Sequence, residues 1–214
     1  MRFHFKRRLL VLAGLGSCCQ LVLATQAPSP VLLILGDSLS AEYGLQRDSG
    51  WVSLLTQRLQ REEIHVRVVN ASISGDTTSG GRSRLPALLQ QHRPAVVVIE
   101  LGGNDALRGL PLAMTEDNLT QMTRAAQAAG ARVLLVGMQL PPNYGRDYGQ
   151  RFAGLFTRVA QAQKAAVVPF ILRGFADGPD AIRYFQADRI HPTEEAQALM
   201  LANVWPTLRK LLPR

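Results

Sequence analysis

The sequence predicts an α/β protein built on a parallel sheet whose two faces are covered by helices. Two observations support this prediction. Short, continuously apolar segments alternate about five times with segments of helical spacing, and most apolar segments end at a turn of glycine and polar residues. Strands buried on both faces have such apolar runs, and their alternation with helices is typical of repeated strand–helix–strand units. We expect a single domain over residues 28–214.

The five predicted strands are short apolar runs, several of them rich in valine, leucine or isoleucine. In chain order they cover residues 31–35, 64–69, 95–99, 132–138 and 165–169. In parallel sheets of this kind, the groups that bind or react gather at the carboxyl ends of the strands.

The predicted helices lie between the strands, where apolar residues recur at the spacing of one helix face. They cover residues 51–59, 78–91, 115–130 and 152–164, and a terminal helix opens at Thr193.

The N-terminus has the order of a secretory signal peptide. Four basic residues occur before residue 9, an apolar run covers residues 9–23, and small residues follow at Ala24 and Ala27. The apolar run is shorter than the ~20 residues that span a bilayer, which favours a signal peptide over a membrane anchor. We therefore expect residues 1–27 to be a signal peptide, cleaved after Ala24 or Ala27, and the protein to be exported.

The only two cysteines, Cys18 and Cys19, belong to this segment. They are interpreted as apolar residues of the signal peptide, although residues 15–18 faintly resemble a lipoprotein processing site. Without this segment the protein contains no cysteine, so its stability must come from its core.

The net charge of the whole chain is +8, and four of the positive charges lie in the signal peptide, which leaves +4. This modest charge is compatible with anionic lipid or acyl-CoA as a ligand. No run of basic and aromatic residues follows residue 30, so nucleic acid is not an expected partner.

Polar residues follow each of the first three predicted strands and precede the last helix. They are Gly36-Asp37-Ser38, residues 70–76, residues 102–105 and residues 188–192. Because parallel strands end at the same edge of a sheet, these groups are expected to converge.

Ser38 is the candidate nucleophile. It follows a tight glycine turn and is expected near a helix N-terminus, where the dipole favours developing negative charge. A serine in this position can also be a simple helix cap. The surrounding pattern differs from the Gly-x-Ser-x-Gly elbow of α/β-hydrolases.

His191 is the candidate base. His65 is expected on the surface of a strand and His92 at the end of a helix, whereas His191 lies in a loop three residues after Asp188. A turn of that length can bring the carboxylate to the imidazole and fix its tautomer, as in a catalytic triad. The alternative is that Asp188 caps a turn and His191 is a bystander.

Asn104 and Gly75 are candidate donors to an oxyanion, through a side-chain amide and a backbone N–H. Both also fit ordinary turns. The scattered histidines have no zinc-ligand spacing and no phosphate-binding loop is found, so neither a metal nor a cofactor is expected.

Taken together, the four segments resemble the SGNH (GDSL) hydrolase family. Its Ser, Gly, Asn and His correspond to Ser38, Gly75, Asn104 and His191, with Asp188 as the triad acid. Residues 33–41, 69–77, 84–89, 100–105, 107–109 and 140–145 are similar to bacterial periplasmic enzymes described as thioesterases, lysophospholipases and arylesterases.

The resemblance implies a three-layer, flavodoxin-like α/β/α fold with a five-stranded sheet in the order 2-1-3-4-5. It also implies hydrolysis of esters and thioesters by a bacterial, periplasmic or secreted monomer that is not inserted in the membrane, with lysophospholipid as one possible substrate. The oxyanion would be bound by Ser38, Gly75 and Asn104. Residues 106–111 form a mobile loop in that group, and Leu107, Pro142 and Tyr144 would line the acyl groove.

Glu42 departs from the family pattern, because close relatives usually have glycine at this position. A positive φ there would strain a glutamate. Two rival functions stay open: a carbohydrate O-deacetylase of the same fold, and a non-catalytic acyl-binding protein.

Overall fold

Five parallel strands form the middle layer of the structure, in the order β2-β1-β3-β4-β5. Every neighbouring pair is parallel. The strands are β1 (Val31–Gly36), β2 (Arg67–Asn70), β3 (Val96–Glu100), β4 (Arg132–Val136) and β5 (Ala166–Val168). The predicted strands and their predicted order are confirmed.

This computed structural model describes residues 29–178 and 180–213, together with Met1. The rest of the predicted signal peptide, with Cys18, Cys19 and both cleavage positions, lies outside the described residues. Within the described range, none of the helices has the length and apolar character needed to cross a bilayer.

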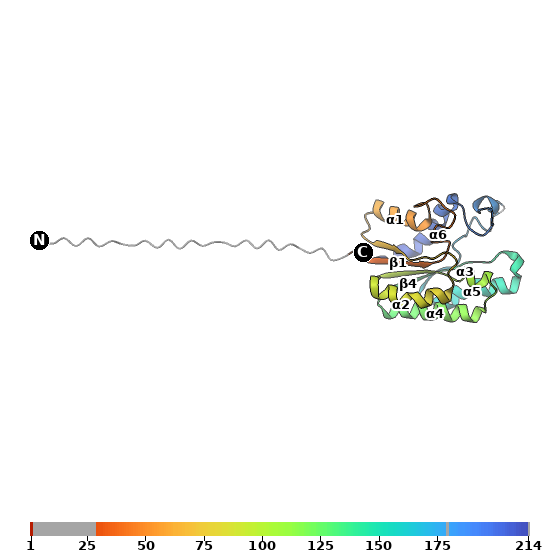
Figure 1. Cartoon of the computed structure of the whole chain (residues 1–214), viewed down its shortest axis with the longest axis horizontal. Coiled ribbons are helices and arrows are strands. Elements are labelled where there is room, and N and C mark those ends of the chain that lie inside the picture. The colour runs from red at the N-terminus through yellow and green to blue at the C-terminus, as the bar shows by residue number, and fades with distance from the viewer. Residues whose placement is uncertain (2–28, 179, 214) are drawn as a thin grey trace.

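Helices cover both faces of the sheet (Figure 1). One layer contains α1 (Trp51–Arg61) and α6 (Glu194–Leu211), which contact each other. The opposite layer contains α2 (Thr78–His92), α4 (Leu112–Ala128) and α5 (Arg146–Gln163). Three short elements lie in the loops: the α-helix α3 (Gly103–Leu107) and the 3-10 turns η1 (Pro142–Tyr144) and η2 (Ala181–Tyr184).

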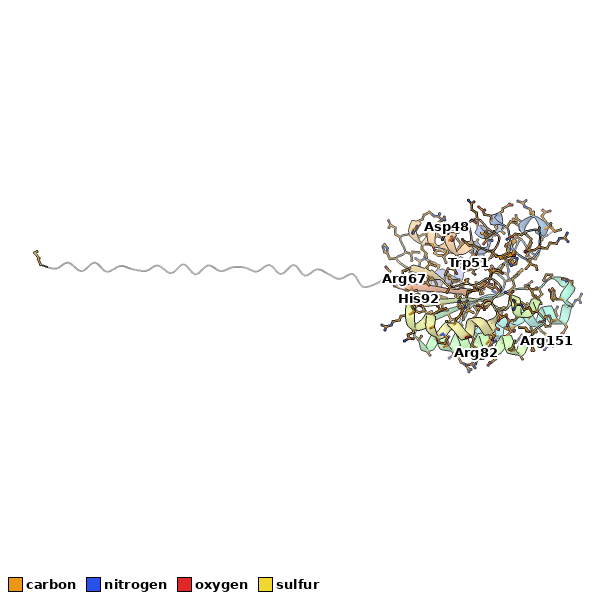
Figure 2. All side chains as sticks on the ribbon, viewed as in Figure 1. Asp48, Trp51, Arg67, Arg82, His92 and Arg151 are labelled. Carbon is orange, nitrogen blue, oxygen red and sulfur yellow. The ribbon has the colours of Figure 1, made fainter. Side chains whose placement is uncertain are left out.

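The alternation of side chains along β1 divides the core in two. Leu32 and Ile34 pack with α1 and α6, whereas Leu33 and Leu35 pack with α2, α4 and α5. Successive strand residues point to opposite faces, so a strand between two helical layers must be apolar throughout. Trp51, the first residue of α1, is fully buried in the first of these cores (Figure 2).

Several predicted boundaries were wrong. α5 begins at Arg146 rather than at 152, and α4 begins at Leu112 rather than at 115. The first turn of α5 is largely exposed, so its sequence has no apolar spacing that would indicate a helix. β2 begins at Arg67 rather than at residue 64. Ile64 and Val66 pack against the core, but they do so from the loop that precedes the strand.

Ser38 was expected near a helix N-terminus, but the segment that follows it is a series of turns over residues 38–44. Glu42 and Gly44 have φ values of 58° and 69°, which no right-handed helix contains. The left-handed backbone at Glu42 and Gly44 therefore prevents a regular α-helix from forming in this segment.

The predicted site residues lie at one edge of the sheet only, the edge formed by the carboxyl ends of the strands. Arg67, the first residue of β2, and His92, the last residue of α2, lie at the amino edge (Figure 2). The strand-end turns that carry the predicted site residues lie at the opposite, carboxyl edge.

Candidate active site

The turn that presents Ser38 depends on close packing beneath it. A Cβ on Gly36 would lie 2.8 Å from the Ser40 Cβ and 2.9 Å from the Glu100 Oε2, so only glycine fits there. The backbone N–H of Leu39 donates to the Asp37 Oδ1 at 3.0 Å. The turn is therefore closed by its own carboxylate, which fixes the position of Ser38.

Ser38, His191 and Asp188 form a continuous hydrogen-bonded chain. The Ser38 Oγ lies 2.8 Å from the His191 Nε2, and the His191 Nδ1 lies 2.7 Å from the Asp188 Oδ2. Because the carboxylate accepts the proton of Nδ1, Nε2 is free to accept the proton of the serine hydroxyl. The arrangement is that of a nucleophile, a base and an orienting acid.

Asp188 is held in the ionised form. Partial burial disfavours its charge, but the backbone N–H groups of His191 and Ile190 donate to its Oδ1 at 3.0 and 2.9 Å. With the bond from the imidazole, these hydrogen bonds outweigh burial and lower the pKa of Asp188 to about 2. Arg189, between the two triad residues, has a φ of 57° that permits this tight return of the chain.

Two backbone N–H groups at the site have no acceptor among the described residues. They belong to Ser38 and Gly75, and Gly75 has a φ of 79° that favours glycine. The Arg108 guanidinium donates to the Gly75 carbonyl at 2.8 Å, which fixes the peptide that follows Gly75. Both N–H groups remain available for a negatively charged oxygen.

The Asn104 amide is already engaged in this structure. Its Nδ2 donates to the Asp37 Oδ2 at 3.1 Å and to the Asp76 carbonyl at 3.0 Å. These partners are the neighbours of Ser38 and Gly75 in the chain, so the amide lies between the two turns. The three predicted oxyanion residues therefore come from adjoining loops.

Two buried carboxyl groups lie against the turn that carries Ser38 and were not predicted as part of the site. Burial raises the pKa of Asp37 to about 6 and raises the pKa of Glu100 well above its usual range. The negative charge of Asp37 raises the pKa of Glu100 further. The Ser40 hydroxyl donates to the Glu100 Oε2 at 2.8 Å, and the Trp51 Nε1 donates to the Ser40 Oγ at 3.2 Å.

Arg84 of α2 joins the first two site loops and was also not assigned a role from the sequence. It donates to the Asp76 Oδ2 at 2.9 Å, to the Ala71 carbonyl and to the Gly36 carbonyl at 3.4 Å. Asp76 and Ala71 lie 8 and 13 residues before Arg84, whereas Gly36 lies 48 residues before it, and no sequence motif indicates that one side chain joins all three.

The His191 loop is covered by Tyr43 and Gln186. The Tyr43 and His191 ring centroids lie 4.4 Å apart, with the ring planes tilted by 41°. The Gln186 amide donates to the Tyr43 carbonyl at 2.9 Å, and the Gln186 backbone N–H donates to the His191 carbonyl at 2.8 Å. The turn after Ser38 is thus joined to the loop that carries His191.

A mainly apolar cavity of 540 Å³ lies at this edge. Its lining includes Gly103 next to Asn104, Ile190 next to His191, and Leu107 of α3. Arg189 and Asp177 are the charged side chains in its lining. A smaller, 420 Å³ hollow at the amino edge contains none of the five predicted site residues.

The predicted groove residues have different positions. Leu107 lines the cavity, whereas the lining does not include Tyr144, which is half-buried in η1. The Pro142 side chain lies outside the described part of the structure. Residues that the sequence did not single out, such as Met138, Phe170 and Ile182, form much of the wall.

Comparison with known proteins identifies the family. The profile of the GDSL-like lipase/acylhydrolase family matches residues 34–199. The chain is 52% identical to esterase TesA of Pseudomonas aeruginosa over 206 residues, which cover 96% of this chain and 100% of the relative. It is 44% identical to thioesterase 1/protease 1/lysophospholipase L1 of Escherichia coli K12 over 171 residues, 80% of this chain and 79% of the relative.

A solved structure supports the same conclusion. The psychrotrophic esterase EstA from Pseudoalteromonas sp., in a structure inhibited by monoethylphosphonate, superimposes with a TM-score of 0.79 and 40% sequence identity. The match covers 85% of this chain and 98% of that chain. With the family match, these similarities confirm the resemblance inferred from the strand-end motifs, and the chain belongs to the GDSL-like lipase/acylhydrolase family.

Proposed function

We propose that this protein is a serine hydrolase that cleaves carboxylic esters and thioesters through an acyl-enzyme on Ser38. The observation that carries the proposal is the chain of hydrogen bonds from Asp188 through His191 to the Ser38 Oγ, at 2.7 and 2.8 Å. Relatives named as an esterase, an arylesterase and a thioesterase/lysophospholipase support both the reaction and the class of substrate.

The first step is attack of the Ser38 Oγ on the substrate carbonyl carbon while the His191 Nε2 takes the hydroxyl proton. The carbonyl π bond opens and leaves a negatively charged oxygen. The N–H groups of Ser38 and Gly75 stabilise that charge. The Asn104 amide joins them by exchanging one of its two present acceptors for the oxyanion.

The second half returns the enzyme to its starting state. The imidazolium of His191 protonates the leaving alcohol or thiol as the tetrahedral intermediate collapses to the acyl-enzyme. Water then gives a proton to His191 and attacks the acyl carbon, and the fatty acid leaves as Ser38 regains its proton. The anionic Asp188 stabilises the imidazolium in both halves.

The acyl chain is proposed to occupy the apolar cavity, with lysophospholipid and acyl-CoA as candidate substrates. The proposal includes export to the periplasm after removal of residues 1–27, and function as a monomer. Each methylene buried in the cavity is worth about 0.8 kcal/mol, which corresponds to about fourfold in kcat/KM. We therefore expect kcat/KM to rise from acetyl toward medium-length acyl esters and thioesters.

The test is turnover of Ser38→Ala, His191→Ala and Asp188→Asn on matched esters and thioesters from acetyl to palmitoyl. Loss of Ser38 or His191 should lower kcat about 10⁴- to 10⁶-fold, and Asp188→Asn about 10⁴-fold. Near-normal activity of Ser38→Ala, in a preparation free of other esterases, would refute the mechanism. If the wild-type protein hydrolysed only acetyl esters, it would be a carbohydrate deacetylase. If it hydrolysed none of the substrates, it would be an acyl-binding protein.

A further inference from the structure

Glu42 occupies a backbone conformation that costs energy and is stabilised by its own side chain. Its φ is 58°, in the left-handed region that costs a non-glycine residue about 1–2 kcal/mol. Its Oε1 accepts from the Gly50 N–H at 2.8 Å and from the Ser53 hydroxyl at 2.7 Å. Its Oε2 accepts from the Asp48 N–H at 3.1 Å.

These three hydrogen bonds fasten the turn after Ser38 to the beginning of α1. Gly50 is the N-cap of α1 and provides no side chain to cap it, and the first turn of α1 contains no acidic residue. The Glu42 carboxylate therefore supplies the negative charge and the acceptors that the positive end of this helix lacks. Asp48 lies in the same layer as α1 (Figure 2).

The residue that follows Glu42 contacts the proposed base. Tyr43 is 50% exposed, yet its ring centroid lies 4.4 Å from that of His191. The Tyr43 backbone N–H donates to the Ser38 carbonyl at 3.3 Å, and its carbonyl accepts from Gln186. Tyr43 is thus bonded through its backbone to the nucleophile turn and to the histidine loop.

The contact with Gln186 is close. A Cβ on Gly44 would lie 2.1 Å from the Gln186 Oε1, so the turn at residues 42–44 lies directly on this side chain. A change in the backbone at Glu42 would therefore be transmitted to Tyr43 and, through it, to the imidazole.

We propose that Glu42 and Tyr43 are positioning residues for the reaction: Glu42 anchors the turn after Ser38 to α1, and this anchor holds the Tyr43 ring against His191. The inference rests on the proposed role of His191 as base. The ring restricts the rotation of the imidazole, so that Nε2 remains within hydrogen-bonding distance of the Ser38 Oγ before substrate binds. Neither residue takes part in bond formation.

The experiment compares Glu42→Ala, Glu42→Gly, Tyr43→Ala and Tyr43→Phe with the wild-type enzyme. The readouts are kcat and KM on p-nitrophenyl butyrate and the rate of inactivation by a p-nitrophenyl phosphonate, which requires Ser38 and His191 but no acyl chain in the cavity. Small misplacements of catalytic groups cost up to about 10²-fold. We expect Tyr43→Ala to lower kcat and inactivation about 10-fold with KM nearly unchanged, and Tyr43→Phe to retain wild-type values.

Glu42→Gly separates positioning from backbone strain. It relieves the cost of the left-handed φ but removes all three hydrogen bonds. The proposal predicts a lower kcat for both Glu42→Gly and Glu42→Ala, and no further loss when Glu42→Ala is added to Tyr43→Ala. Glu63→Ala is the matched control, because Glu63 also has a left-handed φ, 52°, but lies in the turn after α1. Its kcat should not change.

Wild-type kcat in Tyr43→Ala, or in a folded Glu42→Gly, would overturn the proposal. Tyr43 is half-exposed, so its variants test the inference even if those at Glu42 do not fold. Ser38→Ala in the same assays keeps the two conclusions apart. If Ser38→Ala is inactive while Tyr43→Ala is normal, only the positioning role fails, whereas an active Ser38→Ala refutes the proposed function itself.

Discussion

At the scale of single residues, the carboxyl groups of the site differ in pKa because they differ in their contacts with water and with N–H donors. Asp188 is partly exposed and accepts three hydrogen bonds, which lower its pKa to about 2. Asp37 and Glu100 are buried, and burial raises the pKa of both groups. Near neutral pH Asp188 is therefore fully ionised beside the imidazole that becomes positive in the proposed reaction, and Asp37, whose pKa is about 6, is also largely ionised.

The buried pair predicts that stability falls as pH rises. A carboxyl group whose pKa is higher in the folded protein binds its proton more tightly there, so its contribution is complete below the unfolded pKa and is lost through the folded pKa. For Asp37 that interval runs from 3.8 to about 6. We expect the free energy of unfolding, from urea titration, to fall by roughly 1–3 kcal/mol between pH 4 and pH 7.

Glu100→Gln is the matched variant for this prediction. Its amide oxygen can accept from the Ser40 hydroxyl, and the variant carries no charge to repel Asp37. Its stability should depend less on pH over the same interval. An equally steep dependence in both proteins would show that Glu100 is not its source.

The contacts of individual residues could be predicted where both partners lie within a few residues of each other in the sequence. The turn from Asp188 to His191 brings carboxylate and imidazole together within four residues, and the structure has this contact at 2.7 Å. The contact of Tyr43 with His191 joins distant segments, and nothing in either segment indicates it. The acceptors of the Asn104 amide were not predictable for the same reason.

At the scale of elements, close backbone contact at the carboxyl edge fixes how the strands lead into the site loops. A Cβ on Gly137, directly after β4, would lie 2.4 Å from the Pro169 carbonyl oxygen, directly after β5. The two backbone segments lie so close together here that a side chain at residue 137 would not fit between them. Gly137 also exchanges backbone hydrogen bonds with Val168 and Ile171, so this contact begins the segment that leads to the cavity wall.

Gly137→Ala is therefore expected to destabilise the protein by about 2 kcal/mol or more, since a backbone atom cannot move aside as a flexible side chain can. Gly149→Ala is the control, because Gly149 lies in α5 with nothing within 4 Å of its added Cβ. The control should gain about 0.5–1 kcal/mol by restricting the unfolded chain and favouring the helix. Urea unfolding checks both values, and equal stability of Gly137→Ala and the wild type would contradict the packing argument.

The strands and the five long helices were predictable because most of the strands are apolar runs and the helices have apolar residues at helical spacing. The ends of elements were less so. α1 begins where the Trp51 N–H donates to the Gln197 side chain of α6, at 3.1 Å. This acceptor is far away in the sequence, so the residues around Trp51 do not indicate how the helix is capped.

At the scale of the whole molecule, the cavity is built from both halves of the chain. Leu107 comes from α3 and Met138 from the loop after β4. Phe170, Ile182 and Ile190 come from the segment between β5 and α6. The family resemblance predicted the sheet order and the position of the site. It did not predict this wall, because loops between elements determine the lining and vary without changing the fold.

Ala181→Trp tests whether the cavity holds the acyl chain. Ala181 belongs to η2 and lines the cavity, so a tryptophan there would occupy space needed by a longer acyl chain. We expect the ratio of kcat/KM for octanoyl to acetyl ester to fall about 10-fold or more, the equivalent of two buried methylenes. An unchanged ratio, with the variant folded, would place the acyl chain elsewhere.

The hydrogen bond between Ser38 and His191 joins residues 153 positions apart, and α6, which follows His191, packs on α1, which follows Ser38. A chain still being translated carries Ser38, the proposed nucleophile, before His191, its proposed base, has been made. Hydrolysis can begin only when the C-terminal segment has been made and has docked on the N-terminal one. The order of the chain thus links the onset of activity to the completion of both synthesis and folding.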